Sequence, residues 1–330
     1  MPVNSKTLII AEIGVNHNGK ISAAKKLINV AKKAGADYAK FQMYLPNEIA
    51  TKFSKKTKYQ ETSMGRKISQ HDLLKKYYLD FKKIKLLEKY CKKKKIRFLA
   101  SVFDVKSLDL LKKLNVDFIK LPSSEIDNYF LLEALTKQNK KVIFSTGMSS
   151  LSEVNRTYSF LNKRKKLAIP MYCVSSYPTS LDEIDIEILR KIKKRYKLFG
   201  FSDHTLSSES SILATYFGCK FIEKHITLNK NDIGPDHTSS LNPEEFKSFV
   251  QNIRNVELIL KKTKKKFEIE NKTLVRKYLV ASKQIKIGEI FSKNNITAKR
   301  CGGGIETFKF KKIFKKKSKY NFRPDQPLKF

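Results

Sequence analysis

The first three-quarters of the chain alternate between two hydrophobic patterns, and this alternation limits the possible folds more than any other feature. Short apolar, β-branched runs recur eight times, with longer amphipathic segments between them. The runs are residues 7–13, 37–42, 96–103, 117–121, 141–145, 167–173, 198–202 and 220–225. Eight strand–helix repeats are typical of a (β/α)₈ TIM barrel, although an open doubly wound sheet has the same local pattern. We therefore predict an α/β fold with a TIM barrel.

Helical periodicity fills the spaces between the predicted strands. The predicted helices span residues 22–33, 81–93, 106–113, 129–136, 151–161, 184–195, 208–217 and 243–260. The last one has a clear start, because Asn242 precedes Pro243 and two acidic residues follow.

Two segments depart from the alternation. Residues 44–80 are polar, Lys-rich and too long for a bare connection, so we expect them to cover the barrel mouth or to be partly disordered. After residue 266 the pattern changes to short apolar segments and a Gly-rich stretch at 301–305, which predicts a small, mostly β module. We place the boundary near residue 270, so that residues 1–270 form the barrel domain and 271–330 the small domain.

The strong positive charge raises the question of a nucleic-acid partner. The formal net charge is +38, but 59 of the 69 basic residues are Lys, spread through nearly every helical segment. Nucleic-acid surfaces usually depend on Arg for bidentate contacts. We therefore read the Lys residues as solvated surface and predict no nucleic-acid partner. A polyanion-binding protein built on an inactive barrel is the non-enzymatic alternative.

Three absences predict where the protein works. No apolar run reaches the roughly 18–20 residues that a membrane span needs. The N-terminus resembles a first strand and not a signal peptide. The four Cys residues contain no CxxC pair. We expect a cytoplasmic protein without a membrane partner.

Polar side chains stand at the end of every predicted strand, where a barrel carries its active site. Two of them are Lys and five are hydroxyls, which together suit a phosphate and a carboxylate. These residues are Lys40, Lys120, Ser123, Ser145, Ser175, Tyr177 and Ser202. Any single Ser could instead bond to backbone, and a Schiff-base role is the alternative for either Lys.

The remaining strand-end residues suit metal and proton chemistry. His204 and His225 come from neighbouring strands and could converge on one divalent cation with open positions, although each could be a hydrogen-bonded barrel residue. Glu12 and Glu125 are candidates for general acid–base work, and pairing with the two lysines is the alternative.

Eight strings place these residues in a family pattern. IIAEIGVNHNG, YAKFQMY, FIKLPSSEI, VIFSTGM, SSYPT, GFSDHTL, IEKHITL and GPDH follow one another along the chain. In this order they resemble the sialic acid synthase family, the phosphoenolpyruvate-dependent N-acylneuraminate synthases. The tail from about residue 280, with AKRCGGGI, is similar to the C-terminal antifreeze-like (SAF) domain of that family.

The resemblance implies a condensation of phosphoenolpyruvate with an open-chain N-acylmannosamine-type sugar, releasing phosphate. It assigns phosphoenolpyruvate to the seven Lys, Ser and Tyr residues above, and catalysis to Glu12, Glu125 and Lys120. It assigns Mn²⁺ or Mg²⁺ to the two His residues. Sugar contacts would come from Gln42, Asp236 and Arg300. Because the small domain contributes this Arg to the partner's site, the resemblance also implies a domain-swapped homodimer.

Three residues depart from the family pattern: Cys301, Ser175 and Val102, the last of which stands where Pro is common. Cys301 follows Arg300 where many members have Pro, which loosens that loop. Ser175 stands where some members have the larger Asn. The Ile-Gly of AEIG favours the neuraminate and legionaminate branches over the pseudaminate branch. A different phosphoenolpyruvate–aldehyde synthase on the same barrel, making an eight-carbon acid, is the alternative enzyme.

Overall fold

The computed structural model describes residues 6–56, 60–61, 69–163, 168–261 and 266–329. Backbone contacts divide the chain into two compact units, Met1–Lys261 and Lys262–Phe330. The expected boundary at residue 270 lies within a helix, α12, of the second unit. Within the described residues, no helix combines the length and the apolar character that crossing a membrane requires.

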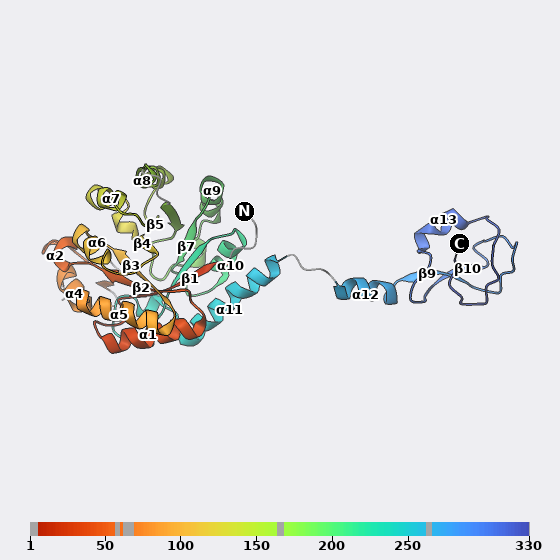
Figure 1. Cartoon of the computed structure of the whole chain (residues 1–330), viewed down its shortest axis with the longest axis horizontal. Helices are drawn as coiled ribbons and strands as arrows, with labels where there is room; N and C mark the ends of the chain where they lie inside the picture. The colour runs from red at the N-terminus through yellow and green to blue at the C-terminus, as the bar shows by residue number, and fades with distance from the viewer. Residues whose placement is uncertain (1–5, 57–59, 62–68, 164–167, 262–265, 330) are drawn as a thin grey trace. The chain divides into compact units, whose positions relative to one another are not determined.

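The first unit is a closed barrel of eight parallel strands in sequential order, so the predicted TIM barrel is confirmed (Figure 1). The strands are β1 (Leu8–Gly14), β2 (Tyr38–Met43), β3 (Arg97–Val102), β4 (Phe118–Leu121), β5 (Lys141–Ser145), β6 (Ala168–Tyr172), β7 (Gly200–Asp203) and β8 (Phe221–His225). Pairing of β1 with β8 closes the ring, with Glu12 opposite His225. The expected first residue of the sixth strand, Leu167, lies outside the described residues.

Helices follow the strands in the order that the periodicity predicts. They are α1 (Ile21–Ala34), α5 (Phe81–Lys94), α6 (Val105–Leu111), α7 (Tyr129–Thr136), α8 (Leu151–Asn162), α9 (Ile186–Arg195), α10 (Glu209–Tyr216) and α11 (Pro243–Leu260). Local sequence fixes several ends. At the start of α11, Asn242 Oδ1 accepts from Glu245 N–H, and Asn242 N–H donates to the Glu245 carboxylate. Gly35 at φ +91° ends α1.

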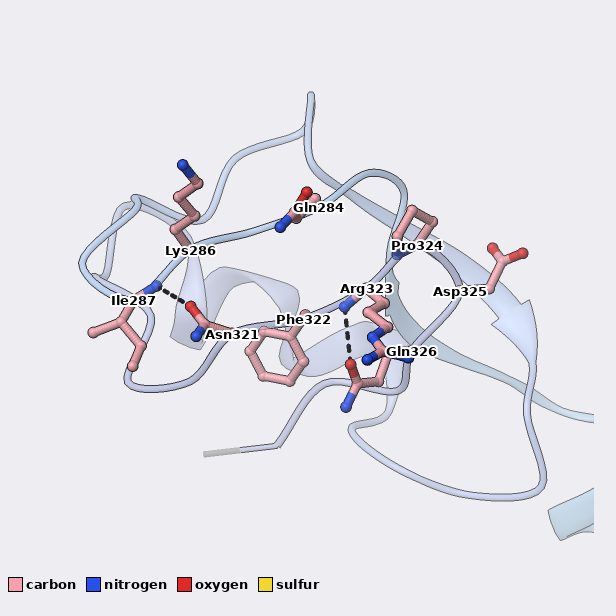
Figure 2. Close-up of a pocket in the computed structure, with 9 residues that line it drawn as sticks. All are labelled: Gln284, Lys286, Ile287, Asn321, Phe322, Arg323, Pro324, Asp325 and Gln326. Atoms are coloured by element: carbon pink, nitrogen blue, oxygen red, sulfur yellow. Dashed lines mark hydrogen bonds between the residues drawn. The ribbon is translucent and has the colours of Figure 1, made fainter.

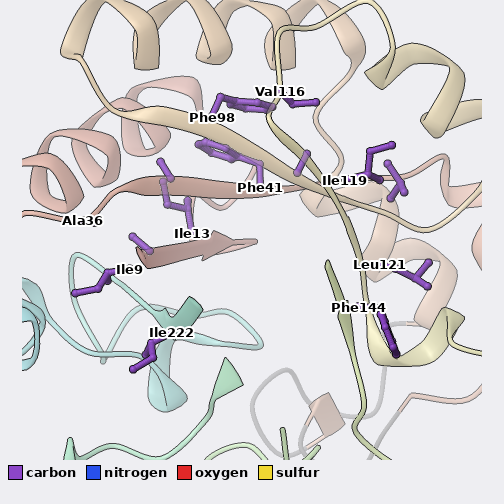
Figure 3. Packing of buried hydrophobic residues seen from close by; sticks show 14 of the residues in the cluster. Ile9, Ile13, Ala36, Phe41, Phe98, Val116, Ile119, Leu121, Phe144 and Ile222 are labelled. Atoms are coloured by element: carbon purple, nitrogen blue, oxygen red, sulfur yellow. The ribbon is translucent and has the colours of Figure 1, made fainter. Parts of the chain in front are cut away.

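Two apolar layers hold the barrel together. One lies between strands and helices, where Phe41 and Phe98 stack with ring centroids 5.6 Å apart (Figure 3). The other fills the barrel interior with Ile10, Leu99 and Phe221 among others. Because successive side chains on a strand alternate between these layers, the polar residues near the strand ends point into the barrel mouth.

The segment between β2 and α5 contains more structure than its polar sequence suggested. Its described residues form a one-turn helix α2 (Pro46–Ile49) and a two-turn helix α4 (Gln70–Tyr77), which Ser69 caps by accepting from Asp72 N–H. Tyr44 Oη donates to the backbone oxygen of Leu74 at 2.9 Å, which ties α4 to the end of β2. Residues 57–59 and 62–68 of this segment lie outside the described residues.

The second unit contains a two-stranded antiparallel sheet of β9 (Lys277–Ala281) and β10 (Ile296–Arg300), together with α12 (Lys266–Val275) and α13 (Phe310–Ile313). Its small core includes Leu279, Ile285 and Phe322. Figure 2 shows a cavity of about 990 Å³ on this unit, shaped by bonds from Ile287 N–H to Asn321 Oδ1 and from Arg323 N–H to Gln326 Oε1.

Candidate active site

One cavity of about 590 Å³ opens at the C-terminal ends of the barrel strands. Thirteen of the fourteen predicted site residues line it: Glu12, Lys40, Gln42, Lys120, Ser123, Glu125, Ser145, Ser175, Tyr177, Ser202, His204, His225 and Asp236. The fourteenth, Arg300, ends β10 in the second unit and is exposed. The barrel therefore brings the predicted strand-end residues together.

A buried ion-pair cluster forms the floor of this cavity. Lys40 Nζ lies 2.7 Å from Glu223 Oε1 and 3.3 Å from Glu12 Oε2. Burial by itself would lower the pKa of Lys40, but the two carboxylates raise it, so Lys40 stays an ammonium ion. A protonated amine is not a nucleophile, and this pairing speaks against a Schiff base at Lys40.

Glu223 is a central residue that the sequence analysis missed. It lies on β8, two residues before His225, and it also accepts a hydrogen bond from Ser202 Oγ at 2.9 Å. Burial alone would raise its pKa, but Lys120, Lys40 and the Ser202 bond lower it, so Glu223 is an anion. The period-two pattern of β8 could have found it, because Glu223 and His225 must face the same side of the sheet.

Lys120 has a different environment from Lys40. Its Nζ donates to Ser145 Oγ on the neighbouring strand, and no carboxylate in the described part of the chain forms an ion pair with it. Burial first, opposed by Glu223 and helped by Lys40, lowers its pKa to about 8. Lys120 thus remains mostly charged at neutral pH and is available to an anionic ligand.

Two predicted hydroxyls meet over Gly147, directly after β5. Gly147 N–H donates to Ser123 Oγ at 3.0 Å, and a Cβ at Gly147 would lie 2.2 Å from Ser175 Oγ and 2.9 Å from Ser123 Oγ. Only Gly allows this approach. The result is a pocket of two hydroxyls beside Lys120, which suits oxygen atoms of a phosphate.

The two predicted histidines face each other at the ends of β7 and β8. Their ring centroids lie 5.5 Å apart, and the ring of Tyr177 lies 4.3 Å from that of His204. Burial lowers the pKa of His204 to about 4. Burial, together with His204 and Lys40 nearby, also lowers the pKa of His225 well below its usual value. Both imidazoles are therefore neutral, the form that binds metals.

The ring nitrogens that face the cavity fit a metal ligand pair. His204 Nδ1 bonds to the backbone oxygen of Val174 at 2.6 Å, so Nε2 carries the lone pair, and its contact is a long hydrogen bond of 3.4 Å with Ser202 Oγ. His225 Nδ1 is buried without a hydrogen-bond partner in the described part of the chain and lies 3.8 Å from Asp236 Oδ2. Among the described residues, His, Cys, Asp and Glu nowhere form a group of three placed to hold a metal ion. A metal here would rest on two protein ligands.

The acidic residues of the cavity differ in their partners. Glu12 pairs with Lys40, the alternative considered for it, but Glu125 forms no ion pair with a Lys in the part of the chain that the structure describes. Glu125 accepts from Asn128 Nδ2 at 2.7 Å and from Ser124 Oγ. Burial and nearby carboxylates outweigh the lysines and raise the pKa of Glu12, and burial raises that of Glu125 and raises that of Asp236 to about 6. With a pKa of about 7, Glu12 can hold a proton close to neutral pH.

Gln42 and Asp236 approach the same point above Glu12. A Cβ on Gly14, whose φ is +53°, would meet Glu12 Oε1, Asp236 Oδ2 and Gln42 Nε2 within 3.6 Å. The bare backbone at Gly14 leaves room for an amide and two carboxyl groups to face a common ligand.

Glycine conformations also shape the loop after Arg300. Gly302, Gly303 and Gly304 all have positive φ angles, and Cys301 Sγ donates to Gly303 O at 3.1 Å. The thiol therefore makes a local bond where the family pattern has Pro.

The closed barrel, with Lys, His and carboxylate side chains gathered in one cavity at its strand ends, defines a barrel enzyme. A model of the NeuB family matches residues 27–265, and a SAF domain model matches 276–330. The chain belongs to the NeuB family.

Named relatives agree with this assignment. The chain is 40% identical to N,N'-diacetyllegionaminic acid synthase of Campylobacter jejuni, over 97% of this chain and 98% of that one. It is 31% identical to human N-acetylneuraminate-9-phosphate synthase, over 88% and 82%. A crystal structure of the sialic acid synthetase of Leptospira borgpetersenii, 32% identical, superposes with a TM-score of 0.70 and covers 82% of this chain and 93% of that one.

Proposed function

We propose that this chain condenses phosphoenolpyruvate with an open-chain N-acylmannosamine-type sugar to give a nine-carbon 2-keto acid and phosphate. One observation carries the proposal: a single cavity gathers two buried Lys residues, a set of hydroxyls and two neutral His residues at the strand ends. Residues 1–270 would hold the reacting groups and residues 271–330 would form the SAF module.

The cavity floor suits phosphoenolpyruvate. Lys40 and Lys120 supply fixed positive charge for its phosphate and carboxylate, while Ser123, Ser175 and the other hydroxyls bind its oxygen atoms. The same two charges stabilise the negative charge that develops on the leaving phosphate. Ser145 orients Lys120 through their hydrogen bond.

The condensation forms one carbon–carbon bond and releases one phosphate. C3 of phosphoenolpyruvate bonds to the aldehyde carbon, water adds to C2, and the C2–O bond to phosphate breaks. Glu12 and Glu125, with their raised pKa values, can hold the proton of that water and return a proton to the aldehyde oxygen.

His204 and His225 would hold Mn²⁺ or Mg²⁺, in keeping with their neutral rings and the buried Nδ1 of His225, which has no hydrogen-bond partner among the described residues. The cation, when bound, supplies Lewis-acid polarisation of the aldehyde oxygen. Gln42 and Asp236 would orient the sugar, and Arg300 of a partner subunit would complete its site. The expected assembly is a domain-swapped homodimer in the cytoplasm.

The test is phosphate release from phosphoenolpyruvate with an N-acylmannosamine-type sugar, with Mn²⁺ and after chelation. We expect release that needs the sugar and stops with EDTA. Sugar-independent release, or none with any aldehyde from the metal-loaded full-length protein, would overturn the proposal. Salt-sensitive retention of nucleic acid without turnover would instead favour the polyanion-binding alternative.

A further inference from the structure

A buried ion pair lies directly behind the two histidines of the cavity. Asp203 is the last residue of β7 and Lys224 is the last but one of β8, so each is the chain neighbour of a proposed metal ligand, His204 or His225. Lys224 Nζ lies 3.1 Å from Asp203 Oδ2, and the exposed fractions of the two side chains are 1% and 0%. Neither residue lines the cavity, and the proposed condensation gives the pair no role.

The alternation of side chains along a strand explains why the pair faces away from the cavity. Ser202 and His204 line the cavity, so Asp203 between them points toward the surrounding helices, and Lys224 does the same on β8. Asp203 and Lys224 also form the last pair in the register of β7 with β8. The ion pair therefore joins the two strands at the point where the histidines follow.

The Asp203 carboxylate holds the backbone beyond His204. Its Oδ1 accepts from Thr205 N–H at 2.9 Å, a bond that spans His204. Its Oδ2 accepts from Ser210 Oγ at 2.9 Å and from Ser211 Oγ, both in the first turn of α10. Together with the ion pair, four donors fill the roughly four acceptor positions of a carboxylate.

The Lys224 ammonium group holds the loop that follows β7. Besides its contact with Asp203, Nζ donates to Thr205 Oγ1 at 3.1 Å and to Ser207 O at 2.9 Å, so three acceptors match its three N–H groups. The ring of Phe249 on α11 lies beside it, with the ring centroid 5.3 Å from Nζ. Because both buried charges are fully paired, the network fixes the geometry of these strand ends.

Resting on the proposed function, we propose that Asp203 and Lys224 are positioning residues that set the spacing of His204 and His225 for a divalent cation. The two residues touch neither the cavity nor its ligands, so they act through the backbone of the two strand ends. Residues that orient metal ligands from outside the site control metal affinity. A site with two protein ligands depends especially on such support, because no third side chain holds the ion.

The first test removes one member of the pair. Lys224→Met keeps a long side chain but loses the charge and the three donors. We expect Kd for Mn²⁺, measured by isothermal titration calorimetry on the full-length protein, to rise about tenfold. Sugar-dependent phosphate release should fall at low Mn²⁺ and recover when Mn²⁺ is raised by about the same factor. A merely structural residue would not give a loss that excess metal restores.

A double variant separates positioning from stability. Lys224→Met alone leaves the Asp203 carboxylate buried without its cation, which destabilises the fold. The combination Asp203→Asn with Lys224→Met removes both charges, so Tm should recover, whereas Kd for Mn²⁺ should stay raised because the strand ends are no longer joined. If circular dichroism shows that the single variant is unfolded, the double variant is assayed in its place.

Arg254→Met is the matched control. Arg254 forms a partly buried ion pair with Asp37, with Nη2 and Oδ2 3.0 Å apart. Asp37 precedes β2, so this pair lies at the opposite end of the barrel from the cavity. The variant should lower Tm without changing Kd for Mn²⁺.

The outcomes distinguish this inference from the proposed function. An unchanged Kd for Mn²⁺ in the folded Lys224 variants, or an equal rise in Arg254→Met, would overturn the inference and leave the synthase function standing. A return to the wild-type Kd in the double variant would overturn it as well, because the pair would then matter only for stability. Absence of Mn²⁺ binding by the wild-type protein would instead count against the proposed metal site, and the inference would fall with it.

Discussion

Lys40 Nζ lies between two buried carboxylates, 2.7 Å from Glu223 and 3.3 Å from Glu12. Glu223 makes the shorter contact and is also held by Ser202. Isolated buried charges are unstable, so Lys40 and Glu223 keep each other charged and in place. The cluster thus links the stability of the barrel mouth to the position of a proposed phosphoenolpyruvate ligand.

Glu223→Gln should destabilise the protein by about 3 kcal/mol, because it leaves Lys40 with one anionic partner. Urea unfolding measures the change. Glu245→Gln is the matched control: its partner Lys230 lies on the surface, where such pairs contribute about 1 kcal/mol or less. If the two variants lose equal free energy of unfolding, the buried ion pair contributes no more to stability than the surface pair.

His204→Ala should abolish sugar-dependent phosphate release and weaken Mn²⁺ binding, with the fold intact. Isothermal titration calorimetry measures the binding and circular dichroism the fold. His71→Ala serves as the control, since His71 Nε2 bonds to Asn47 Oδ1 and lies outside the cavity lining. Substantial turnover in folded His204→Ala would rule out the metal role.

The kcat/KM for phosphoenolpyruvate should fall as pH rises through about 8, the lowered pKa of Lys120. The ammonium form attracts the anion and is present below this pKa, so the loss on the alkaline side should approach tenfold per pH unit. A pH–rate profile measures it. The Lys120→Arg variant keeps its positive charge at alkaline pH, so its kcat/KM should not fall in this range. If kcat/KM of that variant falls in the same way, the fall is due to another group.

Arg300→Ala should raise KM for the sugar more than KM for phosphoenolpyruvate, and equal effects would count against a contact with the sugar. Mixing inactive His204→Ala with Arg300→Ala protomers tests whether the residue acts in trans. Random exchange should restore about one quarter of wild-type activity, because half the dimers contain one site with both native residues. A mixture no more active than its components would place Arg300 in its own subunit's site or outside any site.

Periodicity predicted the barrel well because the barrel repeats one local pattern, an apolar strand followed by an amphipathic helix. Each of the eight β-branched runs forms a strand that is buried on both faces. Helix ends are also determined locally, because residues such as Asn242 and Gly35 bond to backbone groups no more than four positions away. The strand-end side chains could be predicted to meet for the same reason, because a closed parallel barrel brings every strand's C-terminal end to one face.

Periodicity could not predict which side chains inside the cavity bond to one another. Glu125 pairs with Asn128 and Ser124 because a short 3₁₀ turn, Ser123–Glu125, brings it close to them. Glu223 is not the last residue of β8, but it lies on the same inward face as His225, two positions before the strand end. The segment from 44 to 80 is polar on average, which hides the few apolar side chains that it turns inward.

That segment is an addition to the eightfold framework. The barrel core closes through strand pairs and helix contacts, and its buried cluster includes neither Ile49 nor Leu74, so substitutions at these two residues should leave the strand pairing intact. Natural selection can therefore alter this insertion while the barrel framework is inherited unchanged. A lineage could reshape the mouth of the cavity through a few changes in one insertion, without first passing through an unstable enzyme.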